Sequence, residues 1–249
     1  HTSFETPEYT ANADALGTLR ILEAIRILKL QKKTKFYQAS TSEIFGDTNI
    51  PQNEKTPFRP RSPYAISKLY SYWTTINYRE AYNIFAVNGI LFNHEGPRRG
   101  ETFVTRKITR GVSEIFKKKR DCIFLGNLNA KRDWGYAVDY VKSMWLMLKQ
   151  KKPSDYVIST GESRTVREFV EESFKSININ IKWKGKGIKE TGYNPKNNKI
   201  LVKIDPGYFR PTDIKELRGD SRKASRELGW KPSIRFKELV KLMVQNDIK

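Results

Sequence analysis

Apolar residues recur along the chain at two spacings, and stretches with the two spacings alternate. Within residues 10–29, Ala15, Leu19 and Leu22 are separated by four and three positions, which places them on one face of a helix. Residues 85–92 instead form a mostly apolar run, which is typical of a strand buried on both faces of a parallel sheet. The chain is therefore predicted to combine helices with parallel strands.

The same alternation continues over most of the chain. Further strands are predicted at 35–40, 122–125, 156–160 and 200–204, and further helices at 62–82, 103–118, 136–150, 165–177, 221–228 and 235–246. Strands that alternate with helices indicate βαβ units, so we expect an α/β fold with a doubly wound, Rossmann-like parallel sheet. Residues 182–198 are rich in Lys, Gly and Asn without periodicity and are predicted to be a loop, and residues 206–219 are predicted to be irregular.

The chain begins with a predicted helix, where folds of this class normally begin with a strand. It contains no Gly-x-Gly-x-x-Gly turn of the kind that cradles dinucleotide phosphates. Either the protein binds no dinucleotide, or its first strands lie outside this sequence. From about residue 178 the pattern changes, which indicates a smaller C-terminal α/β part interleaved with the sheet-based part.

The 47 Lys and Arg residues exceed the 27 Asp and Glu residues and leave a formal charge of +20. Such an excess could mark a surface that binds nucleic acid, because Lys and Arg neutralise phosphates. The densest basic runs, at 117–120 and 149–152, lie at the ends of predicted helices, where cations stabilise the helix C-terminus. We therefore favour a solvated surface and keep a non-catalytic, polyanion-binding module as the alternative.

Several protein classes are excluded by composition. No apolar run approaches the 18 residues that a membrane span needs, and the N-terminus lacks the layout of a signal peptide. Cys122 is the only cysteine, and His1 and His94 are the only histidines, so we expect no intrachain disulfide and no zinc site. The single cysteine indicates a reducing, cytoplasmic compartment.

Candidate chemistry begins with Tyr64 and Lys68, which are four positions apart in the helix that Ser62 and Pro63 initiate. A lysine ammonium beside a phenol favours the phenolate and lowers the tyrosine pKa toward that of a general base. On spacing alone, a surface pair on an amphipathic helix is the better interpretation. The strand at 35–40 favours the catalytic interpretation, because hydroxyl and carboxylate side chains follow its carboxyl end.

Those side chains belong to Thr41, Ser42 and Glu43, at the end of a strand where α/β sheets bind their ligands. A hydroxyl donor, a carboxylate and an activated phenol could converge there on one sugar-sized pocket. For the three residues alone, a polar turn is the simpler interpretation. Their combination with Tyr64 and Lys68 favours an acid/base site.

Longer motifs surround these residues. Residues 38–46 and 60–68 resemble the extended short-chain dehydrogenase/reductase superfamily, and the long run at 88–107, with 132–135, 208–211 and 228–232, is similar to the GDP-mannose 4,6-dehydratase family. The resemblance covers the chain from Thr2 onward. It departs from the family where the glycine-rich turn and first strands are expected, and this stretch alone is predicted to have negligible affinity for the cofactor.

The resemblance implies an internal redox cycle on NADP. Tyr64 takes the proton of the mannose 4-hydroxyl as hydride leaves C4, Lys68 tunes Tyr64 and holds the nicotinamide ribose, and Thr41 hydrogen-bonds the same substrate oxygen. Glu43 removes the C5 proton and assists loss of the 6-hydroxyl as water, after which hydride returns to C6. The product is GDP-4-dehydro-6-deoxy-mannose.

The resemblance also implies binding residues. The expected NADP ligands are Tyr9, Lys68, His94 and Arg99, and the expected ligands of GDP-mannose are Ser42, Asn93, Lys107, Arg132, Arg210 and Asp213. Guanidinium and ammonium groups suit a diphosphate. Serine at position 42 favours GDP-mannose, because a dehydratase of dTDP-glucose is expected to have aspartate there. Asp213 replaces the glutamate more usual in the family, which shortens its reach toward the ribose.

On this resemblance, residues 1–93 are the remainder of an NADP-binding Rossmann domain, and residues 94–249 are mainly a substrate domain, with about 133–160 returning to the Rossmann part. Arg98 and Arg99 lie in a loop that meets a neighbouring subunit in the family, so a homodimer or homotetramer is expected. Another nucleotide-sugar dehydratase or an epimerase remains an alternative. Glu43 favours a dehydratase over an epimerase, because epimerisation needs no group to take the C5 proton.

Overall fold

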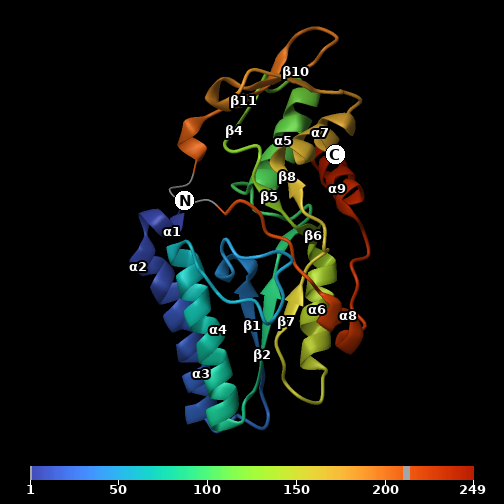
Figure 1. Ribbon diagram of the computed structural model, residues 1–249. Coiled ribbons are helices and arrows are strands. Elements are labelled where there is room, and N and C mark those ends of the chain that lie inside the picture. The colour runs from blue at the N-terminus through green and yellow to red at the C-terminus, as the bar shows by residue number, and fades with distance from the viewer. Residues whose placement is uncertain (1, 210–213) are drawn as a thin grey trace.

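The computed structural model describes residues 2–209 and 214–249. Its N-terminal sheet has three parallel strands in the order β1-β2-β7, with β1 at Lys35–Thr41, β2 at Phe85–Leu91 and β7 at Tyr156–Ile158 (Figure 1). The register sets Lys35 opposite Phe85 and Thr41 opposite Leu91. Every strand therefore ends at the same edge of the sheet, which is where Thr41 lies.

Helices cover both faces of this sheet. On one face, α4 (Pro63–Tyr82) contacts β1 and β2, and α3 (Gly17–Ile27) packs against α4. On the opposite face, α6 (Ala137–Leu148) contacts the same two strands (Figure 1). Leu22 and Ile84 are buried on the first face, and Met147 is buried on the second. The prediction of a doubly wound α/β fold is confirmed.

The helix predicted at 10–29 consists of several parts. The structure begins with α1 (Thr2–Glu5) and α2 (Pro7–Thr10), continues through a wider π-helical segment, η1 (Ala11–Leu16), and then enters α3. By contrast, α4 starts where the sequence predicts. Ser62 accepts a hydrogen bond from the amide of Ala65 at 3.1 Å, and Pro63 occupies the first turn, where its missing N–H is not needed.

A second sheet has the order β4-β11-β10-β9, with β4 at Ile123–Leu125, β9 at Lys182–Lys184, β10 at Thr191–Tyr193 and β11 at Ile200–Ile204. β4 and β11 are parallel, and the other neighbours are antiparallel. Helices α5 (Val104–Phe116), α7 (Val166–Lys175) and α9 (Phe236–Ile248) pack together beside it, around buried residues such as Ile123 and Phe174.

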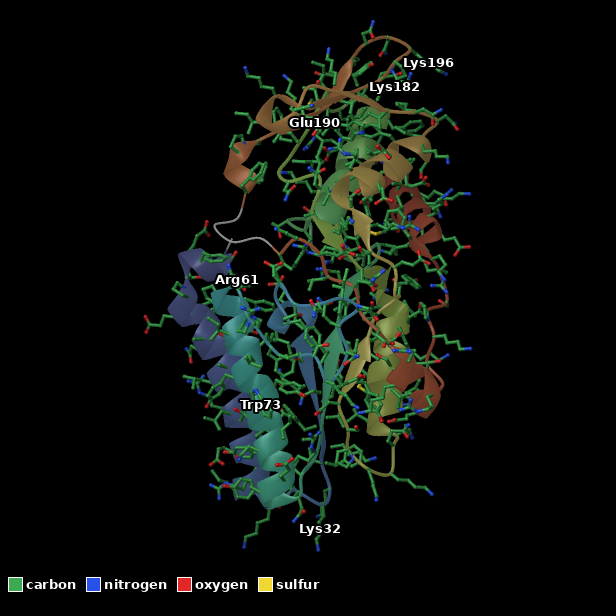
Figure 2. The ribbon with its side chains drawn as sticks, in the orientation of Figure 1. Lys32, Arg61, Trp73, Lys182, Glu190 and Lys196 are labelled. Carbon is green, nitrogen blue, oxygen red and sulfur yellow. The ribbon has the colours of Figure 1, made fainter. Side chains whose placement is uncertain are left out.

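The prediction of an unstructured loop at 182–198 is wrong, because β9 and β10 form a hairpin there with the 3-10 turn η3 (Gly187–Lys189) between them. Lys182 and Lys184 are exposed, and half-buried Trp183 between them packs against the core. Figure 2 shows Lys182 and Lys196 at this basic end of the molecule. The alternation of two lysines around one tryptophan is too short to register as a strand in the sequence.

Short strands link the two parts. β3 (Asn93–Glu95) pairs with β6 (Trp134–Tyr136), and β5 (Lys131–Arg132) pairs with β8 (Arg164–Thr165). The sequence predicted none of these, since two or three residues give no periodicity. The C-terminal stretch contains η4 (Pro206–Tyr208), within the segment predicted to be irregular, and then α8 (Arg222–Leu228), which contacts β7.

One buried carboxylate joins three separate segments between the two parts. Asp133 is fully buried and accepts hydrogen bonds from the amides of Thr160 and Gly161 and from the Thr160 hydroxyl, at 2.6–2.9 Å. It also accepts from the amide of Gly219 at 3.3 Å. Burial raises the pKa of Asp133 to about 6, against the opposing effect of these donors.

Within the described ranges, no helix has the length and apolar character needed to cross a membrane. The same ranges contain no group of three or more His, Cys, Asp or Glu side chains placed to hold a metal ion.

Candidate active site

The end of β1 turns directly into a short 3-10 helix, η2 (Ser42–Ile44). The Thr41 hydroxyl accepts a hydrogen bond from the Glu43 amide at 3.3 Å and caps this turn. Ser42 is buried, with 2% of its surface exposed. The turn therefore places Glu43 next to the carboxyl end of the strand, as the sequence predicted for this segment.

Tyr64 lies in the first turn of α4, next to this strand end. Burial raises the pKa of Tyr64 to about 12, with further contributions from the carboxylates of Glu43 and Asp14. A hydrogen bond with the Thr41 side chain and the charge of Arg99 act in the opposite direction. These interactions bring Thr41, Glu43 and Tyr64 together in one group, although they come from different elements.

Lys68, which is expected to lower the tyrosine pKa, is paired with a carboxylate in the structure. Its ammonium nitrogen lies 3.0 Å from Asp14 Oδ1 and 5.7 Å from the centre of the Tyr64 ring. Asp14 neutralises the charge that would favour the phenolate, and its own carboxylate favours the neutral phenol. The sequence missed Asp14, which is 54 positions from Lys68 and has no local signal that links the two.

His94 follows β2 on the neighbouring strand β3. Its Nδ1 lies 3.0 Å from the carbonyl oxygen of Phe92, and its ring stacks on Tyr140 with the centroids 5.1 Å apart. Burial lowers the pKa of His94, and Arg99 acts in the same direction. The imidazole is therefore neutral at pH 7, which suits a binding residue and agrees with the absence of an acid/base step for it in the expected reaction.

Arg99 lies in the loop between β3 and α5. Its Nε is 3.1 Å from a carboxylate oxygen of Glu95, and its guanidinium carbon lies 3.6 Å from the centre of the Phe103 ring. Because its charge affects both Tyr64 and His94, Arg99 lies close to the acid/base group. The sequence did not single out Glu95, since a carboxylate beside an arginine-rich loop is an ordinary surface pattern.

Two expected diphosphate ligands lie beside one segment. The Lys107 ammonium is 3.2 Å from the centre of the Tyr208 ring, and Arg132 Nη1 donates a hydrogen bond of 2.8 Å to the carbonyl oxygen of Ile214. Tyr208 and Ile214 flank residues 210–213, so the expected ligands Arg210 and Asp213 lie outside the described residues.

The two remaining expected ligands differ in their surroundings. Asn93 is half-buried in β3, opposite Trp134 of β6. Tyr9 is 71% exposed on α2.

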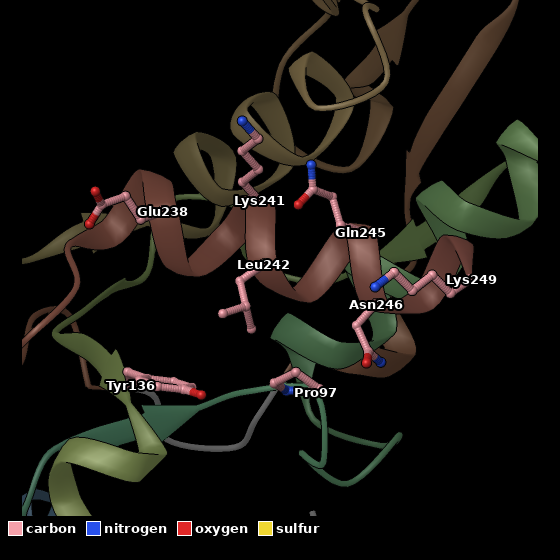
Figure 3. Close-up of a pocket in the computed structure, with 8 residues that line it drawn as sticks. All are labelled: Pro97, Tyr136, Glu238, Lys241, Leu242, Gln245, Asn246 and Lys249. Carbon is pink, nitrogen blue, oxygen red and sulfur yellow. The ribbon is translucent and has the colours of Figure 1, made fainter.

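Two hollows are present elsewhere on the surface. One, of about 390 Å³, lies between α9 and the residues Pro97 and Tyr136, which come from two different segments. Leu242 points from α9 toward these two residues (Figure 3). The other, of about 550 Å³, is lined by residues that include Arg218 and Trp230. Neither hollow is lined by Tyr64 or Glu43. The candidate site is therefore defined by the interactions between its side chains and not by a hollow.

With this geometry established, comparison with known proteins identifies the family. The family described as GDP-mannose 4,6 dehydratase matches residues 1–243. The chain belongs to this family. A GDP-mannose 4,6 dehydratase from Drosophila melanogaster is 58% identical over 247 residues, which are 99% of this chain and 62% of the relative. One from Dictyostelium discoideum is also 58% identical over 247 residues, again 99% of this chain, and the match covers 69% of that relative.

Solved structures support the fold. RMD from Pseudomonas aeruginosa, complexed with NADPH, superimposes with a TM-score of 0.81 at 20% identity, and the match covers 99% of this chain and 76% of that one. A dTDP-glucose 4,6-dehydratase from Streptomyces venezuelae gives a TM-score of 0.79 at 20% identity, covering 98% of this chain and 68% of the other. At these identities the likeness concerns the fold alone.

Proposed function

We propose that the protein is a GDP-mannose 4,6-dehydratase, a hydro-lyase that converts GDP-mannose into GDP-4-dehydro-6-deoxy-mannose. The observation on which this rests is the convergence of Thr41, Glu43 and Tyr64, in which the Glu43 carboxylate raises the pKa of Tyr64 and Thr41 hydrogen-bonds its phenol. A phenol and a carboxylate that act on each other across one site can take protons from neighbouring positions of one hexose, the phenol from the 4-hydroxyl and the carboxylate from C5. Relatives at 58% identity that are named for this reaction support the substrate.

The residues near Tyr64 fit a nicotinamide dinucleotide. Lys68 and Arg99 supply cationic donors suited to ribose hydroxyls and phosphates, and neutral His94 adds an uncharged ring. We therefore propose NADP as the cofactor, with Tyr9, Lys68, His94 and Arg99 as its ligands. When bound, NADP would accept a hydride from the substrate and return it.

The chain's own residues would move the protons. Tyr64 takes the proton of the 4-hydroxyl while Thr41 holds the same oxygen, and Glu43 takes the proton at C5 and then protonates the departing 6-hydroxyl, which leaves as water. When hydride returns to C6, C5 takes up the proton that Tyr64 received, so that both side chains end as they began. A phenol with a pKa near 12 keeps its proton at pH 7, so the pKa of Tyr64 must fall before it can accept the proton of the 4-hydroxyl. Thr41 and Arg99 both favour the ionised phenol.

The other proposed ligands belong to the sugar nucleotide. Ser42, Asn93, Lys107 and Arg132 would contact GDP-mannose, with Arg210 and Asp213 from the intervening segment. Lys107 contacts Tyr208 and Arg132 contacts Ile214, and these partners precede and follow that segment in the sequence, which supports a shared diphosphate site. We propose residues 1–93 as the remainder of the NADP-binding domain and 94–249 as mainly the substrate domain, with about 133–160 interleaved.

We further propose that the protein is a homodimer or homotetramer. α4 presents an apolar stripe to solvent, formed by Ile66, Tyr70 and Trp73, whose exposed fractions are 58%, 43% and 55%. Residues at this spacing share one helix face, and Figure 2 shows Trp73 on α4. An exposed aromatic stripe on a helix is typical of a subunit interface.

Turnover of GDP-mannose by the full-length protein with NADP tests the function. Tyr64→Phe and Glu43→Gln are each expected to lower kcat by about 10²–10⁴-fold, the usual contribution of a positioned acid or base, with little change in the Kd of GDP-mannose. Tyr82→Phe and Glu80→Gln, at exposed positions in the last turns of α4, are matched controls expected to behave as wild type. Unchanged turnover in Tyr64→Phe or Glu43→Gln would contradict the assigned roles. A salt-dependent gel shift without turnover would instead favour the polyanion-binding alternative.

A further inference from the structure

A buried carboxylate outside the proposed proton-transfer group lies one residue from His94. Glu95 is 2% exposed in β3. It accepts a hydrogen bond of 2.6 Å from the Thr105 hydroxyl and pairs with Arg99 at 3.1 Å. A carboxylate is costly to bury unless charged and hydrogen-bonding partners surround it, so burial opposes the ionisation of Glu95 and these two contacts favour it.

The same two contacts fix the loop that joins β3 to α5. Arg99 lies in the middle of this loop, and Thr105 lies in the first turn of α5. The Arg99 guanidinium also packs over the Phe103 ring, with its carbon 3.6 Å from the ring centre. The Arg99 side chain therefore contacts Glu95 through its Nε and Phe103 through its guanidinium carbon.

The position of Arg99 affects the proposed active site. Its charge lowers the pKa of Tyr64 and that of His94, and both effects depend on distance. A displacement of the guanidinium would change the proton affinity of Tyr64 and remove a cation from the proposed cofactor site. Whatever holds Arg99 thus acts on the reaction without touching the substrate.

We propose that Glu95 is a positioning residue: its carboxylate holds the Arg99 guanidinium and the first turn of α5 where Arg99 acts on Tyr64 and on the cofactor. The proposal rests on the proposed function, because it takes Arg99 to be a cofactor ligand. The clamp itself, formed by Glu95, Arg99 and Thr105, is a property of the fold and can be measured without cofactor.

The clamp should depend on pH near neutrality. The groups that face Glu95 are Arg99 from the loop, Thr105 from α5, and Tyr140 from α6, whose pKa the carboxylates of Asp133 and Glu95 both raise. Burial raises the pKa of Glu95 to about 7, against the effects of Arg99 and Thr105. Ionised Glu95 attracts Arg99 and protonated Glu95 does not, so the clamp strengthens as the pH rises through 7.

Calorimetric titration of the full-length protein with NADP⁺ between pH 6 and 8.5 tests the effect on the site. Glu95→Gln keeps the shape and an acceptor for Thr105 but loses the charge. It is expected to bind NADP⁺ about tenfold more weakly than wild type at pH 8, with a smaller difference at pH 6. Glu101→Gln is the matched control, because Glu101 lies in the same loop, is 68% exposed and pairs with Arg110. Equal affinities of Glu95→Gln and wild type at pH 8 would overturn the proposal.

A double-mutant cycle on thermal unfolding, without cofactor, tests the clamp independently. Glu95→Gln, Arg99→Gln and the double variant are expected to be non-additive, since each single change removes the same ion pair. Additive losses would overturn the clamp. Wild type that fails to bind NADP⁺ would contradict the proposed function and leave the result of the cycle valid.

If Glu95→Gln does not fold, Thr105→Val serves instead. It removes one donor to the carboxylate and is expected to move the rise in NADP⁺ affinity to higher pH, because ionised Glu95 then has less support. An unchanged pH profile in Thr105→Val would count against the proposal.

Discussion

Asp14→Asn should lower the pKa of Tyr64. Asp14 pairs with Lys68 at 3.0 Å, and its carboxylate raises the pKa of Tyr64. Asparagine has nearly the same shape but no charge. The substitution therefore removes a negative charge that disfavours the phenolate and leaves the Lys68 ammonium without its counter-ion, and both changes favour ionisation of Tyr64.

The distance from Lys68 to Tyr64 gives the magnitude. The ammonium nitrogen lies 5.7 Å from the centre of the phenol ring. At an effective dielectric constant of about 20, a unit charge at that distance interacts by about 3 kcal/mol, or about 2 pKa units. The side chains of Lys68 and Asp14 are 15% and 29% exposed, so solvent screens part of this effect. We expect a shift of about one unit.

The pH dependence of kcat for GDP-mannose turnover measures this shift. A base with a lower pKa is deprotonated at lower pH, so the acidic limb of the profile should move down by about one unit in Asp14→Asn. Asp121→Asn is the control, because Asp121 pairs with Lys199 on the surface of the other part and is 87% exposed. An acidic limb that stays in place, or moves to higher pH, would refute the electrostatic reasoning.

Two predictions concern stability and use urea unfolding. Gly46→Ala should lower the free energy of unfolding by about 3 kcal/mol, because Gly46 has φ +60° and a Cβ there would lie 1.9 Å from the carbonyl oxygen of Arg59. Gly187 has nearly the same φ, +59°, but open space around it, so Gly187→Ala should lower this free energy by only about 1 kcal/mol. Equal losses would show that backbone conformation and not contact dominates. Asp155→Asn should cost about 3 kcal/mol, because it breaks the paired bonds of 2.9 Å from Arg79 and leaves that cation largely buried. A loss below about 1 kcal/mol, the usual value for an exposed pair, would contradict this.

Local signals in the sequence were sufficient for the long elements. The Ser62 cap and Pro63 predicted the start of α4, and the apolar run at 85–92 predicted β2, because each depends on neighbouring residues only. The position of Thr41 and Glu43 at a strand end also followed from the pattern. Their proximity to Tyr64 depends on the parallel arrangement of the sheet, which the alternation of strands and helices predicted.

The interactions that tune the site could not be predicted in the same way. Asp14 meets Lys68 only because η1 and α4 pack side by side, and the burial of Glu95 depends on Arg99, Thr105 and α6. Such contacts join residues without a fixed spacing, and the resulting pKa values depend on burial. For this reason the sequence could not show that Asp14 offsets the effect of Lys68 on Tyr64.

The hydrogen bonds of Asp133 limit how the two parts can move. Its carboxylate receives donors from residues 160, 161 and 219, which belong to two stretches of chain far apart in sequence. Separating the parts at that point would leave a carboxylate in the interior without donors, at a cost of several kcal/mol. Residues 133, 160–161 and 219 are therefore expected to stay together in any rearrangement of the protein, because separating them would carry this cost.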